Sequence, residues 1–307
     1  MITLERLTKR FGRTVAVEGL DLRVRPGVVT GFLGPNGAGK STTIRMILGL
    51  DRPTGGRALV SGRPYAGFRR PLREAGALLD AKAVHPGRTA RNHLRAMARS
   101  NDIPPSRVDE VLATAGLTEV ADRRVGTYSL GMSQRLGIAG ALLGDPPVLI
   151  FDEPVNGLDP DGVRWIRQLM RTLAGEGRTV FVSSHLMSEM QLTADHLVVL
   201  GRGRLIADSP IGEVLGAGTR AVTVRCPDPI QLRVLRDRLT GGGAVVQDAG
   251  SEALTVEGAD IASVGDAAFA AGVRLHELSS GTASLEDAYH RLTAQSVEFA
   301  GPEGVAW

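Results

Sequence analysis

Nine consecutive residues carry the clearest chemistry in this chain of 307 residues. They are, in order, Gly34, Pro35, Asn36, Gly37, Ala38, Gly39, Lys40, Ser41 and Thr42, and the first eight match the pattern G-x-x-x-x-G-K-[ST]. Glycines let a backbone fold closely around an anion, and the amides of such a loop point at phosphate oxygens. Lys40 is placed to reach the β- and γ-phosphates, and the hydroxyl of Ser41 to bind Mg²⁺. The pattern therefore predicts a loop that binds ATP or a similar nucleoside triphosphate.

Two carboxylates follow an apolar stretch farther along the chain. Residues 148–151 are all apolar, and Asp152 and Glu153 come directly after them. A strand of this kind is typical of a parallel sheet buried on both faces, and ligands of such sheets bind at the carboxyl ends of the strands. Neighbouring side chains of a strand point to opposite faces, so Asp152 is expected to hold Mg²⁺ and Glu153 to polarise water. The alternative is a solvated strand end.

A histidine follows a second strand that is expected to be buried, residues 179–184. A single histidine is usually structural. At the end of a central strand, in a chain that also has a phosphate loop and an acidic strand end, His185 is instead placed to contact the γ-phosphate.

Two further segments are weaker candidates for the nucleotide site. Phe11 lies in a turn expected between two strands, where an exposed ring could stack on a purine; the alternative is a phenylalanine of the core or of the turn. Ser129 and Gly131 precede an apolar helix, where they could bind an anion. The alternative for Ser129 is an ordinary helix N-cap.

The segments around these residues predict an α/β fold. A strand over residues 29–33 leads into the glycine-rich loop, and a helix over residues 42–50 follows it. Further strands are expected at residues 2–7, 14–24, 55–60, 73–79, 197–200 and 204–207. Thr89 and Ser106 are expected to cap two helices. Because these helices interrupt the α/β alternation, a helical lobe is predicted at about residues 81–135.

A second, smaller domain is predicted over residues 219–292, after a first domain at residues 1–215. Its strands are expected at residues 221–225, 244–247, 253–256 and 273–278, with helices at 229–239 and 261–271. This order, βαββαβ, is ferredoxin-like. Ser284 is expected to cap a last helix, and residues 293–307 to form a loosely held tail.

Composition narrows the class of protein. No run approaches the roughly 18 apolar residues of a membrane span. The first residues lack a secretory pattern, and Cys226 is the only cysteine, so no internal disulfide is expected. These observations fit a cytoplasmic protein. The net charge is only +3 and no block of five or six like charges occurs, so a nucleic-acid partner is not expected.

The order of these motifs resembles that of an ATP-binding subunit of an ABC transporter, over about residues 1–215. Within that family, residues 76–81 and 129–132 are similar to subunits that serve drug and antibiotic exporters of the daunorubicin-resistance type. The resemblance implies a P-loop ATPase fold with an antiparallel β subdomain and a helical lobe, and it implies ATP and Mg²⁺ as ligands.

The resemblance also implies a role for each candidate residue. Phe11 would stack on adenine, and Asp152 would hold Mg²⁺ through water. Glu153 would be the general base, and His185 would hold the γ-phosphate. Asp159 would belong to a loop that links two nucleotide sites.

The family further implies partners. Two such domains pair head-to-tail, so that the phosphate loop of one and the Ser129 segment of the other, with Ser129 and Gly131, enclose each ATP. Only one phosphate loop is present, so the working unit requires a second copy. A separate membrane permease would be driven by the pair, which would lie at the cytoplasmic side of the membrane.

The chain departs from the family pattern at three positions. Asp80 stands where the family has a glutamine. As a candidate metal ligand it is shorter and negatively charged, so it is not expected to contact Mg²⁺ and water in the same way. Leu130 and Met132 replace a glycine and a glutamine, so the contacts of those side chains are not expected.

The function expected from the resemblance is an ATP-driven motor that exports a drug, an antibiotic or a lipid-like compound. The alternative is a soluble ABC-type ATPase that acts on nucleic acid or the ribosome, although such proteins usually carry two cassettes, a coiled coil or a zinc insertion. A catalytically inactive subunit is opposed by the intact Lys40, Asp152, Glu153 and His185. The second domain is expected to be an interaction or regulatory module, or else a passive cap that stabilises a dimer.

Overall fold

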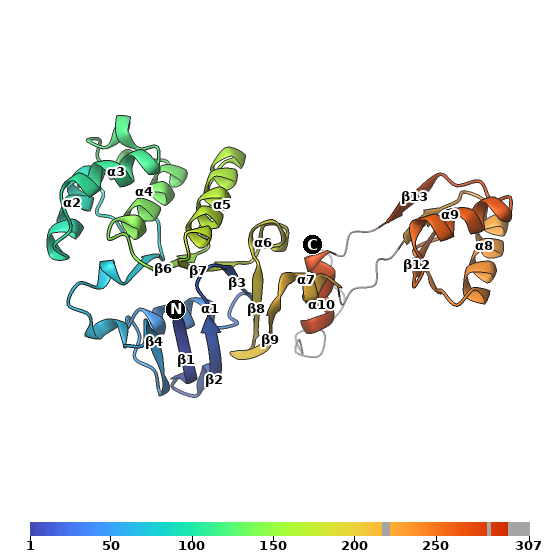
Figure 1. Cartoon of the computed structure of the whole chain (residues 1–307), viewed down its shortest axis with the longest axis horizontal. Helices are drawn as coiled ribbons and strands as arrows, with labels where there is room; N and C mark the ends of the chain where they lie inside the picture. Colours follow the sequence, from blue (N-terminus) through green and yellow to red (C-terminus); the bar gives the residue numbers. More distant parts are fainter. Residues whose placement is uncertain (217–221, 281–283, 294–307) are drawn as a thin grey trace. The chain divides into compact units, whose positions relative to one another are not determined.

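The computed structural model describes residues 1–216, 222–280 and 284–293. The chain forms two compact units, one built from Met1–Ile211 and the other from Gly212–Arg291 (Figure 1). Among the described residues, none of the helices combines the length and the apolar character that a membrane span requires.

The first unit is organised around a six-stranded sheet with the strand order β5-β6-β7-β3-β8-β9. Its strands are β3 (Val29–Leu33), β5 (Ala75–Leu78), β6 (Val148–Asp152), β7 (Thr179–Ser184), β8 (His196–Gly201) and β9 (Arg204–Pro210). The first five strands of this order pair in parallel, and β9 is antiparallel to β8. Since β3 and β7 are buried along their whole length, the sheet is covered on both faces, as the apolar runs predict.

A second sheet confirms the predicted antiparallel subdomain. It has the order β2-β1-β4, from β1 (Ile2–Phe11), β2 (Thr14–Val24) and β4 (Gly55–Val60). Gly12, with φ +56°, turns the chain between β1 and β2. This sheet shares one hydrophobic core with helix α1 (Lys40–Ile47) and with the central sheet, to which Leu4, Ile44 and Phe32 contribute.

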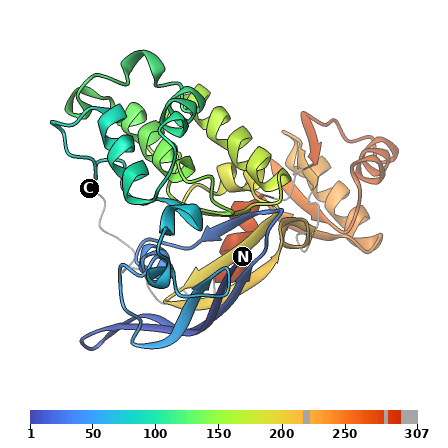
Figure 2. The same ribbon diagram turned by 60° about the vertical axis from the view of Figure 1, so that its left-hand side comes forward.

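Three helices form the helical lobe: α2 (Ala90–Ser100), α3 (Ser106–Thr114) and α4 (Leu130–Leu142). Helices α5 (Pro160–Gly175) and α6 (Met187–Thr193) belong to the same unit, and short 3₁₀ helices occur at Tyr65–Gly67, Pro71–Arg73, Thr118–Val120 and Val125–Thr127. Figure 2 shows the lobe and the antiparallel sheet on opposite sides of the unit, as Figure 1 does.

The capping predictions for the lobe have opposite outcomes. Thr89 caps α2, because its Oγ1 accepts a hydrogen bond from the amide of Asn92 at 3.2 Å. The prediction for Ser106 is wrong, because Pro105 holds the N-cap position of α3 and no side chain caps that helix. The carbonyl oxygens of residues 104 and 105 already accept the first amides of the helix, so the serine hydroxyl has no capping amide left to bind.

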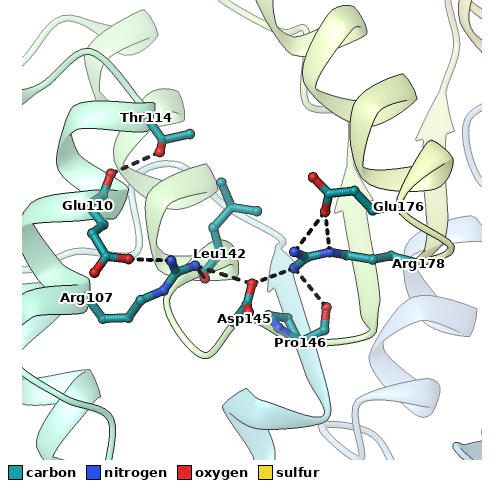
Figure 3. Close-up of polar contacts among 8 residues, drawn as sticks. All are labelled: Arg107, Glu110, Thr114, Leu142, Asp145, Pro146, Glu176 and Arg178. Carbon is teal, nitrogen blue, oxygen red and sulfur yellow. Dashed lines mark hydrogen bonds and ion pairs between the residues drawn. The ribbon is translucent and has the colours of Figure 1, made fainter.

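A network of hydrogen bonds between charged side chains connects the helical lobe to the central sheet (Figure 3). Asp145 lies in the turn between α4 and β6, in left-handed backbone with φ +49°. Its Oδ1 accepts hydrogen bonds from Arg178, just before β7, at 2.8 Å, and from Arg107 of α3 at 3.4 Å. Arg107 also donates to the carbonyl oxygen of Leu142, at the end of α4, at 3.1 Å. One carboxylate therefore joins two helices of the lobe to the start of β7.

The second unit has the predicted ferredoxin-like fold. Its elements are β10 (Val222–Arg225), α8 (Pro229–Gly241), β11 (Val245–Asp248), β12 (Ala253–Glu257), α9 (Ile261–Ala270) and β13 (Glu277–Ser280), with α7 (Ile211–Gly216) and α10 (Leu285–Thr293) flanking them in the chain. The strands form an antiparallel sheet of order β11-β12-β10-β13, and this order with the element sequence βαββαβ is the ferredoxin-like arrangement.

Two details of the second unit differ from, or extend, the predictions. The last strand begins at Glu277 and not at Val273, because the amide of Val273 bonds to the carbonyl of Ala268 and closes the end of α9. Ser284 is placed as predicted at the start of α10, where its Oγ accepts from the amide of Glu286 at 3.1 Å. The predicted tail lies outside the described residues from position 294 onward.

Candidate nucleotide site

The glycine-rich loop connects β3 to α1, as the pattern predicts. Gly39 is the N-cap of α1 and has φ +102°, a conformation that side chains rarely adopt. A Cβ at Gly34 would lie 2.5 Å from the carbonyl oxygen of Leu200. The first fixed glycine is therefore required by close packing against β8, and the second by its backbone conformation.

A cavity of about 250 Å³ lies over this loop. It is lined by Ala16, the loop from Pro35 to Thr42, and Glu153. A larger cavity of about 610 Å³ opens near the starts of β3 and β8 and contains none of the loop residues. Volume alone would favour the larger cavity, but that cavity lacks the glycine-rich loop and mixes Arg23 and Arg25 with four carboxylates.

Lys40 is the buried cation of the loop. Its Nζ donates hydrogen bonds to the carbonyl oxygens of Gly34 at 2.6 Å and Pro35 at 3.3 Å. Burial lowers the pKa of Lys40, while the charges of Glu153 and Asp152 oppose that shift. The buried ammonium group of Lys40 is thus near enough to the two acids at the end of β6 for their charges to act on it.

The strand order brings the two acids to β7. Asp152 pairs with Ser183 in the register of β6 and β7, and the hydroxyl of Ser183 donates to Asp152 Oδ1. The amide of Glu153 donates to Ser183 Oγ at 3.0 Å. Glu153 itself has φ +51°, so the chain turns sharply as it leaves the sheet.

Glu153 and His185 lie within hydrogen-bonding distance. His185 Nδ1 is 2.8 Å from Glu153 Oε2. The carbonyl oxygen of Glu153 accepts a hydrogen bond from Gln134 Nε2 at 3.1 Å. The structure therefore brings the predicted base and the predicted γ-phosphate contact together at one edge of the sheet, beside the loop cavity.

Two polar residues of this edge, Ser183 and Gln134, were not among the predicted site residues. Both are buried, at 0% and 4% exposure. The signal in the sequence was their polarity within mostly buried elements, β7 and α4. Polarity alone does not identify the hydrogen-bond partners of Ser183 and Gln134, because those partners depend on which strands and helices are neighbours in the fold.

Ser129, Gly131 and Asp159 form a separate surface, which we call the Ser129 face. Ser129 Oγ accepts from the amide of Met132 at 3.1 Å and caps α4. Asp159 Oδ1 accepts from the amide of Gly162 at 2.8 Å and caps α5. These two helix starts are adjacent, because a Cβ at Gly131 would lie 3.1 Å from the carbonyl oxygen of Gly157. None of the three residues lines the loop cavity.

Phe11 and Asp80 are also apart from the loop cavity. Phe11 ends β1 with 52% of its surface exposed, so the interpretation as a core residue is wrong. Its ring centroid lies 4.9 Å from Lys9 Nζ. Asp80 follows β5, and its Oδ1 accepts from the amide of Lys82 at 2.8 Å. Its predicted contact with a metal ion stays a prediction.

The donors at the loop suit a magnesium ion that is bound mainly by phosphate. Within the described residues, no group of three or more His, Cys, Asp or Glu side chains could hold a metal ion. Mg²⁺ in nucleotide sites takes one or two protein oxygens together with phosphate oxygens and water. Ser41 on the loop and Asp152, one of whose oxygens is bound by Ser183, supply such oxygens.

A groove of about 330 Å³ runs between the helical lobe and the central sheet. Its lining is mostly apolar and includes Leu79, Asp80, His93, Met97 and Leu136. His93 Nδ1 is buried without a hydrogen-bond partner among the described residues, and burial lowers the pKa of this histidine. The groove therefore offers an apolar surface with one unpaired nitrogen.

The chain is similar to known proteins in both units. A family model described as ABC transporter matches residues 17–156, and one described as a domain of unknown function matches residues 220–286. The bacitracin transport ATP-binding protein BcrA of Bacillus licheniformis is 39% identical over 235 residues, which cover 76% of this chain and 77% of that protein. The Nod factor export ATP-binding protein I of Burkholderia pseudomallei is 35% identical over 239 residues, covering 76% and 79%.

A solved structure extends the similarity to three dimensions. It is described as the dimeric structure of a bacterial ABC transporter cassette, and it matches with a TM-score of 0.64 and 25% identity. The match covers 69% of this chain and 99% of the solved chain.

Proposed function

The chain belongs to the ABC transporter family, and from this premise we propose that it is the ATP-hydrolysing motor of an exporter whose membrane permease is a separate chain. The observation that carries the proposal is that Lys40 and Glu153 line one loop cavity, with His185 hydrogen-bonded to Glu153 and the charge of Asp152 acting on Lys40. The proposed cargo is an antibiotic, a drug or a lipid-like compound, since similar proteins are named for bacitracin transport and Nod factor export.

ATP binding is assigned to the loop and to Phe11. The loop amides and Lys40 would hold the phosphates, and Ser41 with Asp152 would hold Mg²⁺. When bound, Mg²⁺ neutralises charge on the phosphates. Phe11 would stack on the adenine, for which its exposed ring at the end of β1 is suited.

Hydrolysis is assigned to Glu153 and His185. Glu153 lines the loop cavity, where it would accept a proton from the attacking water. His185, hydrogen-bonded to the same carboxylate, would orient it and contact the γ-phosphate. A base held by a second polar group in this way loses less conformational freedom when substrate binds.

We further propose that the Ser129 face completes the site of a second copy. Ser129 and Asp159 are exposed at helix N-termini, where backbone amides and the helix dipole favour an anion. A γ-phosphate between one chain's loop and the partner's Ser129 face would hold both chains together. Hydrolysis would remove that bridge and the preference for the closed pair.

The permease would dock on the groove beside the helical lobe. The groove is lined by Asp80 as well as by apolar side chains of α2 and α4, so a docked segment would contact both the lobe and the end of β5. The complex would lie at the cytoplasmic side of the membrane. For the second domain, residues 219–292, we propose an interaction or regulatory role, which suits the highly exposed Phe269 of α9, at 88%.

The test is reconstitution of the chain in lipid vesicles with a candidate permease chain. We expect ATP turnover that rises when a transported compound is added, and ATP-dependent movement of a bacitracin-type peptide in a cargo screen. ATP turnover without any partner permease, together with salt-sensitive binding to DNA, would contradict the export proposal and favour the soluble alternative.

A further inference from the structure

A buried serine occupies the centre of the catalytic edge. Ser183 lies on β7 with 0% of its surface exposed. In the register of the sheet it is flanked by Asp152 of β6 and Phe32 of β3. The three residues before it, residues 180–182, are large and apolar. Hydrogen-bond partners stabilise a hydroxyl in such a place, since an unpaired buried hydroxyl is costly.

The Ser183 hydroxyl has two partners, one on each acidic residue. It donates to Asp152 Oδ1 and accepts from the backbone amide of Glu153 at 3.0 Å. A serine hydroxyl has one donor and two acceptor sites, so one group can serve both partners at once. The side chain of the proposed metal ligand and the backbone of the proposed base are thus held by one oxygen atom.

The contact to Glu153 supports an unusual backbone conformation. Glu153 has φ +51°, which is costly for a residue with a side chain and persists only where its surroundings enforce it. Its amide faces both Ser183 Oγ and, at 3.2 Å, the carbonyl oxygen of the same serine. From this conformation the carboxylate reaches His185 and the loop cavity.

We propose that Ser183 is a positioning residue for ATP hydrolysis that couples the geometry of Asp152 to that of Glu153. By binding Oδ1, it fixes the Asp152 carboxylate with Oδ2 directed away from the serine, for the metal ion. By accepting a hydrogen bond from the Glu153 amide, it keeps the Glu153 side chain at the wall of the loop cavity. This inference rests on the proposed ATPase function and adds a residue that touches neither substrate nor metal.

The test compares Ser183→Ala with a matched control on the same strand. Thr179 begins β7, is also fully buried, and its Oγ1 has no hydrogen-bond partner among the described residues. Thr179→Val therefore removes a buried hydroxyl that positions nothing. Ser183→Thr keeps the hydroxyl and tests rescue, and Ser183→Cys keeps the volume with a weak donor should the alanine variant not fold.

Two measurements distinguish positioning from mere stability. The first is the affinity for Mn²⁺ in the presence of a non-hydrolysable ATP analogue, followed by electron paramagnetic resonance. The second is the separation of kcat from KM for ATP. Loss of a group that orients a metal ligand typically weakens metal affinity or activity by about 10- to 100-fold.

For Ser183→Ala we expect a loss of that size in Mn²⁺ affinity and kcat, with KM for ATP within about twofold because the loop is unchanged. Ser183→Thr should recover most of both, and Thr179→Val should match the unmodified chain. Unchanged Mn²⁺ affinity and kcat in a folded Ser183→Ala or Ser183→Cys variant would overturn the inference. An unmodified chain without ATPase activity would instead overturn the proposed function itself.

Discussion

The loop edge of the nucleotide unit and its Ser129 face differ in what their polar side chains contact. At the loop edge, Glu153 bonds to His185 and Asp152 to Ser183, so side chains from different strands hold one another. On the Ser129 face, the side chains of Ser129 and Asp159 each accept a hydrogen bond from an amide of the helix that they cap. One region is therefore preorganised within a single chain, and the other exposes two helix N-termini at the surface.

The cause of the difference is the geometry of the two regions. Parallel strands β3, β6 and β7 end at one edge of the sheet, so residues far apart in sequence meet there. Helices α4 and α5 begin at the surface, where each needs a cap for its first amides. The comparison predicts that substitutions at the loop edge alter ATP binding or hydrolysis directly. Substitutions at the Ser129 face should alter hydrolysis only by changing how two copies of the chain pair.

The largest expected effect follows Glu153→Gln. The amide keeps the size of the side chain but cannot accept a proton, so hydrolysis should fall by about 10²- to 10⁴-fold while ATP binding remains. Dimers with bound ATP should accumulate, since the phosphate bridge is no longer broken.

Phosphate release and light scattering after gel filtration with ATP measure this effect. Glu119→Gln, at an exposed position of the helical lobe, is the matched control. Turnover equal to that of the unmodified chain would remove Glu153 from the base role.

Lys40→Ala should have the next largest effect, on binding rather than on chemistry alone. Charge-assisted hydrogen bonds in a buried site contribute enough that their loss should raise the Kd for ATP by about 10- to 100-fold. Calorimetric titration of the chain with ATP checks this value, with Lys82→Ala as the control lysine. Unaltered affinity in the Lys40→Ala variant would contradict the assignment of the loop cavity.

The smallest expected effect follows Asp145→Asn, in the turn that connects the two regions through α4 and β6. Asparagine tolerates left-handed backbone, so the change removes only the charge that Arg107 and Arg178 share. The carboxylate is 60% exposed, and such ion pairs contribute about 1 kcal/mol or less to stability.

Thermal unfolding of this variant at low and high salt provides the measurement. We expect a decrease in the unfolding midpoint that shrinks at high salt, because salt screens exposed charges, with ATP affinity unchanged. A large loss of ATPase activity would show instead that the turn couples the two regions.

Local patterns predicted the parts of the site that are continuous in sequence. The loop, the acidic end of β6, and the position of His185 after β7 all follow from runs of a few residues. The ferredoxin-like order was predictable because turns and alternation mark each short element. Ser183 and Gln134 were missed because their roles depend on the adjacency of β6, β7 and α4, which a single sequence does not state.

The errors at element ends have the same origin. Ser106 matched a capping pattern, but prolines before it had already supplied acceptors for the helix amides. Val273 looked like the start of a strand, but its amide closes the preceding helix. In both cases backbone hydrogen bonds over three or five residues decided the boundary, and side-chain patterns do not report such bonds.

The most direct test of a site shared between two copies is a mixture of two inactive variants, Lys40→Ala and Ser129→Arg. Each alone should be inactive, although Ser129→Arg should still bind ATP. In a mixed pair, the loop of the Ser129→Arg chain meets the intact Ser129 face of the Lys40→Ala chain, so one site is whole. Random pairing should restore about a quarter of the unmodified rate. A mixture as inactive as its components, or full turnover by the Ser129→Arg chain alone, would contradict the account.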